Sequence, residues 1–85
     1  MQITVTMQDI LDGQMQACYA CPIALAVARQ TGTQWRILNY SATHPDKPVR
    51  VTLPEEAATF IAAFDSVLPV DPFTFEFPIE TATKI

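Results

Sequence analysis

The alternation of apolar and polar residues predicts four strands along the chain. Residues 3–7 place isoleucine, valine and methionine opposite two threonines, and residues 73–77 place three phenylalanines opposite threonine and glutamate. A period of two with β-branched or aromatic residues is typical of a strand with one buried face. Residues 33–42 and 49–53 show the same alternation on either side of a turn rich in proline. We expect these two segments to form an antiparallel hairpin.

Two helices are predicted between these strands. Pro22 suits the first position of a helix, where its missing N–H is not needed. The apolar run after it ends at Gly32, a residue that readily adopts the left-handed conformation of a helix end. Residues 54–68 carry apolar side chains at the i, i+3, i+4 and i+7 positions of an amphipathic helix, with two glutamates in the first turn. Residues 6–13 provide at most one further helical turn, with Thr6 as its cap.

The order of these elements predicts an α+β fold. Strand, helix, strand, strand, helix, strand is the β-α-β-β-α-β order of the ferredoxin-like split βαβ. In that fold, two helices cover one face of a four-stranded antiparallel sheet. An α+β sandwich with another strand order is the alternative. The 85 residues are enough for one domain, which we place at residues 1–78, with residues 79–85 as a frayed C-terminal tail.

The composition indicates a protein that binds other proteins. Apolar residues make up 49% of the chain and charged residues only 16%, against about 25% charged in an average soluble domain. So few charges cannot cover the surface of a small domain, and we expect a second copy or another protein to cover part of it. The net charge of −4 argues against direct binding to nucleic-acid phosphates.

The chain also lacks the patterns of membrane and secreted proteins. The longest aliphatic run, residues 23–28, is far shorter than the ~18 residues that span a bilayer. The first ten residues have neither the basic start nor the apolar segment of a signal peptide. We therefore expect a cytoplasmic protein with no membrane partner.

The candidate chemistry lies at Cys18 and Cys21, three residues apart just before the predicted helix. As the N-cap of that helix, Cys21 would sit near free N–H groups and the positive end of the dipole, which lowers a thiol pKa. One interpretation is therefore a redox pair, with Cys21 as the nucleophile. A second is half of a tetrahedral zinc site that a two-fold dimer would complete. A third is that both cysteines are small residues packed beneath a buried helix.

Aromatic residues are the other candidate site. Trp35, Tyr40 and Tyr19 are predicted to line an interface or a small-ligand pocket, with core packing as the alternative. The two glycines of the chain form no phosphate-binding loop, and the sequence contains no Ser/His/Asp arrangement. We therefore predict no catalytic residues and no cofactor, apart from the zinc interpretation.

Three stretches of the chain resemble a family of short, uncharacterised bacteriophage-encoded proteins. They are "ITVTMQDI", "CYACPIALAVAR" and "VTLPEEAATFIAAFDSVLPVDPFTFEF", which are similar to the family's C-x-x-CP-(I/V)-ALA motif and its PV-x-PF-x-FE end. The family usually has a glycine where this chain has Ser66-Val67, so we expect no tight turn there and a helix that continues to Leu68. The resemblance implies a phage accessory protein in the host cytoplasm and assigns no catalytic residue.

These observations predict a small, dimeric, non-catalytic protein that binds and modulates a host protein, in defence or in transcription. The first alternative is a thiol-redox or zinc-binding protein that uses Cys18 and Cys21. The second is an oligomeric protein that sequesters a nucleotide signal between aromatic residues at a subunit junction.

Overall fold

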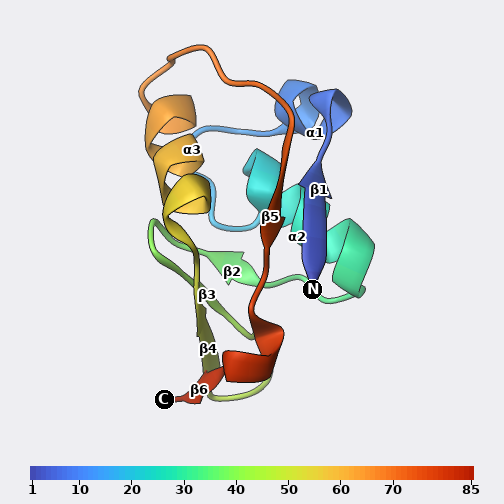
Figure 1. Ribbon diagram of the computed structural model, residues 1–85, viewed down its shortest axis with the longest axis vertical. Helices are drawn as coiled ribbons and strands as arrows, with labels where there is room; N and C mark the ends of the chain where they lie inside the picture. Colours follow the sequence, from blue (N-terminus) through green and yellow to red (C-terminus); the bar gives the residue numbers. More distant parts are fainter.

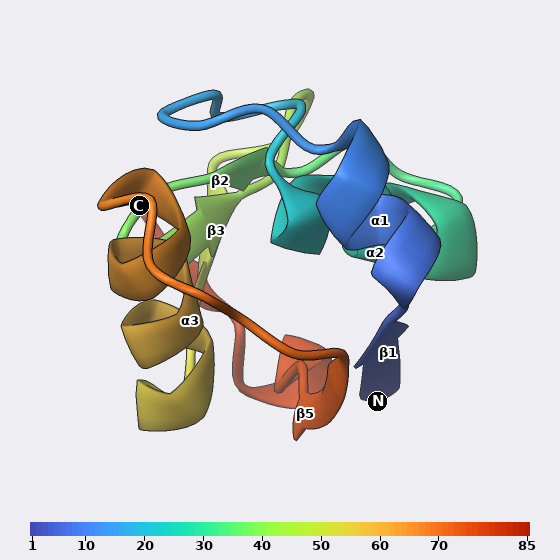
Figure 2. The same cartoon turned by 90° about the horizontal axis from the view of Figure 1, so that it is seen from above.

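The computed structural model describes all residues from Met1 to Ile85. It is an α+β structure with three α-helices and two antiparallel sheets (Figure 1). The elements in chain order are β1 (Gln2–Val5), α1 (Met7–Asp12), α2 (Pro22–Thr31), β2 (Arg36–Ile37), β3 (Ser41–Thr43), β4 (Val49–Thr52), α3 (Glu55–Asp65), β5 (Phe73–Glu76), the 3-10 helix η1 (Ile79–Thr81) and β6 (Thr83–Lys84). Seen from above, α1 and α2 lie on one side of the molecule and α3 on the other (Figure 2).

The first sheet joins the two ends of the predicted domain. β1 pairs antiparallel with β5, so that Ile3 lies opposite Phe75 and Val5 opposite Phe73. The outer edge of β1 is covered by α2, because the Gln30 amide group bonds both backbone groups of Thr4. The Thr4 N–H donates to Gln30 Oε1 at 3.0 Å, and Gln30 Nε2 donates to the Thr4 carbonyl at 2.7 Å. The side chain thus satisfies edge groups that another strand would otherwise pair.

The second sheet has the order β2-β3-β4-β6. The predicted continuous strand over residues 33–42 is wrong, because it is broken at Asn39 and Tyr40. The Leu38 N–H donates to the Ser41 carbonyl at 2.8 Å, which closes a tight turn and places Tyr40 in solvent. The tail over residues 79–85 is also not frayed as we predicted. It forms η1 and then β6, which pairs with β4 from Val49 to Arg50.

The predicted α+β class is confirmed, whereas the ferredoxin-like arrangement in one four-stranded sheet is not. Two of the three strand pairs that one four-stranded sheet requires, first with last and second with third, are present, but the pair of the first strand with the third, which would join them, is not. They lie in separate sheets, and one physical reason is that Gln30 occupies the free edge of β1. A third helix, α1, takes the place of the single turn that we expected.

The capping of α1 follows the predicted pattern. The Asp9 N–H donates to the Thr6 hydroxyl, and the Asp9 carboxylate accepts the Thr6 N–H at 2.8 Å, which forms a capping box. The same carboxylate pairs with Arg29 of α2 at 2.6 Å. The helix ends at Asp12 with Gly13 as its C-cap, where a Cβ atom would lie 2.5 Å from the ring of Pro22. Glycine therefore permits the start of α2 to approach the end of α1.

The end of α3 differs from the prediction. We expected the helix to continue to Leu68, but it ends at Asp65 with Ser66 as its C-cap. Val67 then adopts a left-handed φ of 61°. The Leu68 N–H donates to the Ala63 carbonyl at 2.9 Å and the Val67 N–H to the Phe64 carbonyl at 3.1 Å, which together form a Schellman motif. The tight turn exists although a valine occupies the position that favours glycine.

One hydrophobic core connects both sheets and the helices. Its centre includes Phe77, which has no exposed surface and follows β5 toward the second sheet. Ile3 and Val5 of β1, Ile23 of α2 and Val51 of β4 are equally inaccessible to solvent. The apolar faces that the alternation predicts for β1 and β4 are therefore buried, except that Met7 already belongs to α1 and is half exposed.

Candidate functional site

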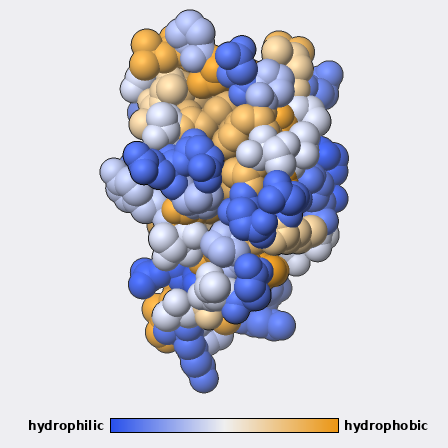
Figure 3. All heavy atoms as spheres, viewed as in Figure 1, coloured by the Kyte–Doolittle hydropathy of each residue, from blue (hydrophilic) through white to orange (hydrophobic).

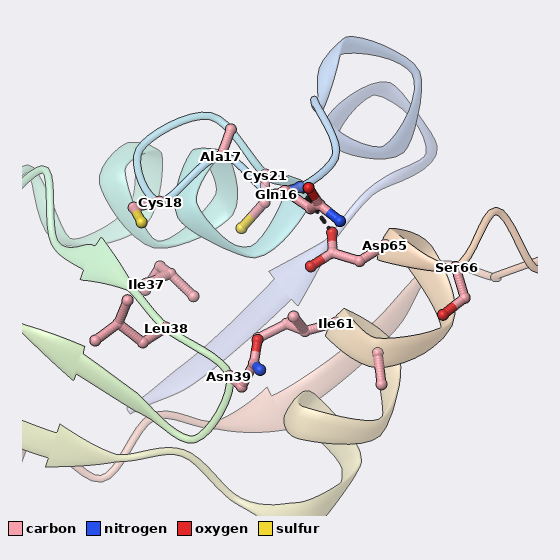
Figure 4. Close-up of a pocket in the computed structure, with 11 residues that line it drawn as sticks. Gln16, Ala17, Cys18, Cys21, Ile37, Leu38, Asn39, Ile61, Asp65 and Ser66 are labelled. Carbon is pink, nitrogen blue, oxygen red and sulfur yellow. Dashed lines mark hydrogen bonds between the residues drawn. The ribbon is translucent and has the colours of Figure 1, made fainter.

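The largest pocket lies where the loop before α2, the turn after β2 and the second half of α3 meet (Figure 4). Its volume is about 520 Å³, within the range of about 300–1,000 Å³ that small-ligand sites occupy. The residues that line it are Gln16, Ala17, Cys18, Cys21, Ile37, Leu38, Asn39, Ile61, Ala62, Asp65 and Ser66. We call it the Cys–Asp65 pocket.

The pocket has an apolar floor and a more polar mouth. Cys21, Ile37 and Ile61 are buried in the core and form the floor. At the mouth, Leu38 and Asn39 are exposed. An apolar depression with a few polar groups at its rim is the usual form of a site that takes a side chain or a small ligand.

Cys21 is the N-cap of α2, as the sequence predicts, but its surroundings disfavour the thiolate form. Its Sγ accepts a hydrogen bond from the Ala24 N–H at 3.4 Å. Burial raises the pKa of the Cys21 thiol above its usual 9.0, and the hydrogen bonds from the backbone of Ala24 and Ile23 only partly offset this. The negative charge of Asp65 raises the pKa further. The predicted lowering of the Cys21 pKa is therefore wrong, because desolvation outweighs the helix N-terminus.

Cys18 has a structural role through its backbone. Its carbonyl accepts the Ile37 N–H at 2.8 Å, which fastens the loop before α2 to β2. Both sulfur atoms project from the same wall of the pocket toward Ile37 and Leu38 (Figure 4). Both cysteines are free thiols; Cys18 is half-buried and Cys21 is buried. No group of three or more His, Cys, Asp or Glu residues comes together in the chain to hold a metal ion.

Asp65 is a functional candidate that the sequence analysis missed. Its Oδ1 accepts the N–H of Gln16 at 2.9 Å, and Gln16 adopts a left-handed φ of 55° to make this contact. The second carboxylate oxygen points into the pocket and has no protein partner (Figure 4). The sequence does contain a signal for this residue, namely an aspartate in the last turn of a predicted helix. The helix dipole disfavours a negative charge at that end, so an aspartate there indicates a role other than helix stabilisation.

The three predicted aromatic residues have different environments. Tyr40 is 73% exposed and Tyr19 is 48% exposed. Each directly follows a residue of the pocket wall, Asn39 and Cys18 respectively. Trp35 does not share this surface with the two tyrosines, because it is only 3% exposed and packs in the core, which is the alternative that the sequence left open, and its ring borders a separate pocket beside His44.

Trp35 instead links the second sheet to the core. Its ring makes edge contacts with His44 at 5.0 Å and with Phe77 at 5.3 Å between centroids. Its Nε1–H has no hydrogen-bond partner, although the two neighbouring rings offer aromatic faces as weak acceptors. The alternation of residues 33–37 places Trp35 on the same face as Ile37, and both side chains are buried.

A second, wholly separate pocket lies between the ends of α1 and α3. Its volume is about 400 Å³. Its lining is almost entirely apolar and comprises Ile10, Met15, Phe64, Val67, Leu68, Pro69 and Val70. On the face drawn in Figure 3, apolar residues are most extensive in the upper part and polar residues predominate in the lower part. We call it the α1–α3 pocket.

The comparisons with known proteins identify no relative. No protein-family model, curated protein or solved structure matches the chain. Its longest helix, the eleven-residue α3, is too short to cross a bilayer, as is every other helix of the structure.

Proposed function

We propose that this is a non-catalytic binding protein that holds another protein at the Cys–Asp65 pocket. The observation that carries the proposal is an open, apolar-floored pocket flanked along the chain by the exposed Tyr19 and Tyr40. Tyrosine is enriched among the residues that dominate protein interfaces, and these residues cluster near the centre of an interface, in well-packed pockets. As the resemblance implies, the partner is a host protein in the bacterial cytoplasm whose activity is modulated in defence or transcription.

The interaction is tested with two matched exposed residues. Tyr40 and Leu11 are 73% and 70% exposed, and only Tyr40 adjoins the pocket. Immobilised wild-type protein and the variants Tyr40→Ser and Leu11→Ser are incubated with a bacterial lysate, and retained proteins are identified by mass spectrometry. We expect a protein that the wild type and Leu11→Ser retain in stoichiometric amounts and that Tyr40→Ser loses.

Two results would contradict this proposal. Retention of no protein in stoichiometric amounts would remove the evidence for a protein partner. Loss of the partner in Leu11→Ser but not in Tyr40→Ser would assign the interface to α1 instead. Circular dichroism of both variants checks that the fold survives, which we expect because neither side chain belongs to the core.

We further propose that two copies associate through the α1–α3 pocket. Met15, Val67 and Leu68 in its lining are all at least half exposed, and the low charge content of 16% favours covering such a surface. Light scattering after size exclusion is then expected to give twice the chain mass of 9.4 kDa. A Leu68→Asp variant is expected to return to the single-chain mass, and a wild type that is already a single chain would refute the dimer.

The thiol-redox and zinc alternatives gain less support from the geometry. A nucleophilic or zinc-binding cysteine acts as a thiolate, whereas burial favours the thiol form of Cys21. The nucleotide alternative stays a prediction, and its proposed aromatic set is reduced to Tyr19 and Tyr40 because Trp35 is buried.

A further inference from the structure

The charge distribution in the Cys–Asp65 pocket suggests what kind of side chain would enter it. Asp65 is the one charged residue among those that line the pocket. Its Oδ1 is occupied by the Gln16 N–H, so the fixed Gln16 loop holds the carboxylate in place. The second oxygen points into the pocket without a partner (Figure 4). An ionised carboxylate oxygen without a partner favours a cationic donor, because hydrogen bonds between charged groups are the stronger ones.

A second acceptor lies at the same opening. The Asn39 amide lies beside Ile61 on the pocket side (Figure 4), and this side chain has no hydrogen-bond partner within the chain. A carboxylate oxygen and an amide oxygen at one opening match the planar fork of a guanidinium, which carries five N–H donors, better than a compact ammonium.

The apolar walls of the pocket match the aliphatic stem that carries a guanidinium in arginine. Leu38 and Ile61 form opposite sides of the pocket (Figure 4), and an arginine side chain buries its aliphatic stem along apolar surface while its charged head stays among polar groups. The net charge of −4 also attracts a basic partner over longer distances.

We propose that the Cys–Asp65 pocket binds an arginine side chain of the partner protein, with Asp65 as the residue that pairs with its guanidinium. This inference rests on the proposed function, since it names the group through which the partner is held. A hydrogen bond between charged groups is worth about 1.5–3 kcal/mol, which corresponds to a loss of at least about 10-fold in affinity when the charge of Asp65 is removed.

The test is an NMR titration of the protein with N-acetyl-argininamide. Its neutral isostere, N-acetyl-citrullinamide, serves as the matched ligand control. Asp65→Asn retains an oxygen that accepts the Gln16 N–H but loses the charge, and Asp71→Asn removes an exposed charge elsewhere. We expect saturable shifts at the amides of Cys18, Leu38 and Asn39 in the wild type and in Asp71→Asn. We expect affinity at least about 10-fold weaker in Asp65→Asn and no saturable shifts with the citrulline compound.

The inference is overturned if the arginine compound gives no saturable shifts at the pocket, or if the citrulline compound binds equally well. The second comparison uses wild-type protein only, so it decides the matter even if Asp65→Asn does not fold. Partner capture that depends on Tyr40, together with a failed arginine titration, would refute the arginine inference alone. Capture that does not depend on Tyr40 would refute the proposed function whatever the titration gives.

Discussion

Replacement of Val67 by glycine is expected to stabilise the protein. Val67 holds a left-handed φ of 61° at the end of α3, where its N–H and that of Leu68 bond the carbonyls of Phe64 and Ala63. A residue with a side chain pays about 1–2 kcal/mol for this conformation, and a β-branched residue is especially unsuited to it. The side chain is 77% exposed within one chain, so its removal sacrifices little apolar burial when unfolding is measured at protein concentrations at which the proposed dimer has dissociated.

The change in stability is the free energy gained by relieving backbone strain in the folded state, less the cost of a more flexible unfolded chain. Glycine makes the unfolded chain more flexible, which costs about 0.5–1 kcal/mol. The difference spans about 0–1.5 kcal/mol, so the expected net gain in the free energy of unfolding for Val67→Gly is about 0.75 kcal/mol, the centre of that range. For a domain of this size, 1 kcal/mol changes the melting temperature by about 4–8 °C, so the midpoint is expected to rise by about 3–6 °C.

The assay is thermal and urea unfolding followed by circular dichroism. Ser66→Gly is the matched control, because Ser66 is also exposed but its φ of −96° suits any residue. This control gains flexibility without relief of strain, and we expect it to lose about 0.5–1 kcal/mol. A Val67→Gly variant that is no more stable than the wild type, or that loses as much as Ser66→Gly, would refute the argument from backbone strain.

Two further predictions concern stability, and both are read from unfolding curves. The folded-state pKa of Cys21 is raised above 9.0. The buried thiol therefore contributes its full share to the free energy of unfolding below about pH 9, and this share is lost as the pH rises through the higher pKa of the folded state. The wild type and Cys18→Ala are expected to lose stability with rising pH above about 9 more steeply than Cys21→Ala, and equal slopes would contradict the buried-thiol description. Gln30→Ala is expected to lower the free energy of unfolding by about 1–2 kcal/mol, because two hydrogen bonds to Thr4 are lost. The exposed Gln34→Ala is its control, and an equal effect of both variants would show that Gln30 does not protect the edge of β1.

The sequence predicted well those elements that local chemistry determines. The alternation at residues 3–5 and 73–77, the proline at the start of α2 and the left-handed Gly32 at its end all have the expected roles in the structure. The threonine cap of α1 is equally local, since Thr6 and Asp9 are three residues apart.

The errors come from interactions between residues far apart in the sequence. The amide of Gln30 covers an edge of β1 twenty-six residues away, and no periodicity indicates such a contact. The pairing of β6 with β4 likewise joins segments whose local patterns do not reveal each other. The turn at Asn39 and Tyr40 interrupts an alternation that favours a strand, because pairing between β2 and β3 stabilises the hairpin instead.

The candidate site was only partly predictable for the same reason. The cysteines were identified from their spacing, but the sign of the Cys21 pKa shift depends on burial under α3 and β2 that the spacing does not show. Asp65 joins the site through a bond to Gln16 forty-nine residues away. Trp35 and Tyr40 share an aromatic character, and only the tertiary structure separates a core residue from an exposed one.

Site-specific photo-cross-linking tests the central claim most directly. The photoreactive amino acid p-benzoylphenylalanine replaces Tyr40 beside the Cys–Asp65 pocket or, as a control, the exposed Lys84 in β6 at the polar end of the molecule. After irradiation with the captured partner, we expect a covalent adduct at position 40 whose cross-linked partner peptide contains an arginine, and none at position 84. Adducts at position 84 alone, or equally at both positions, would contradict binding at the pocket.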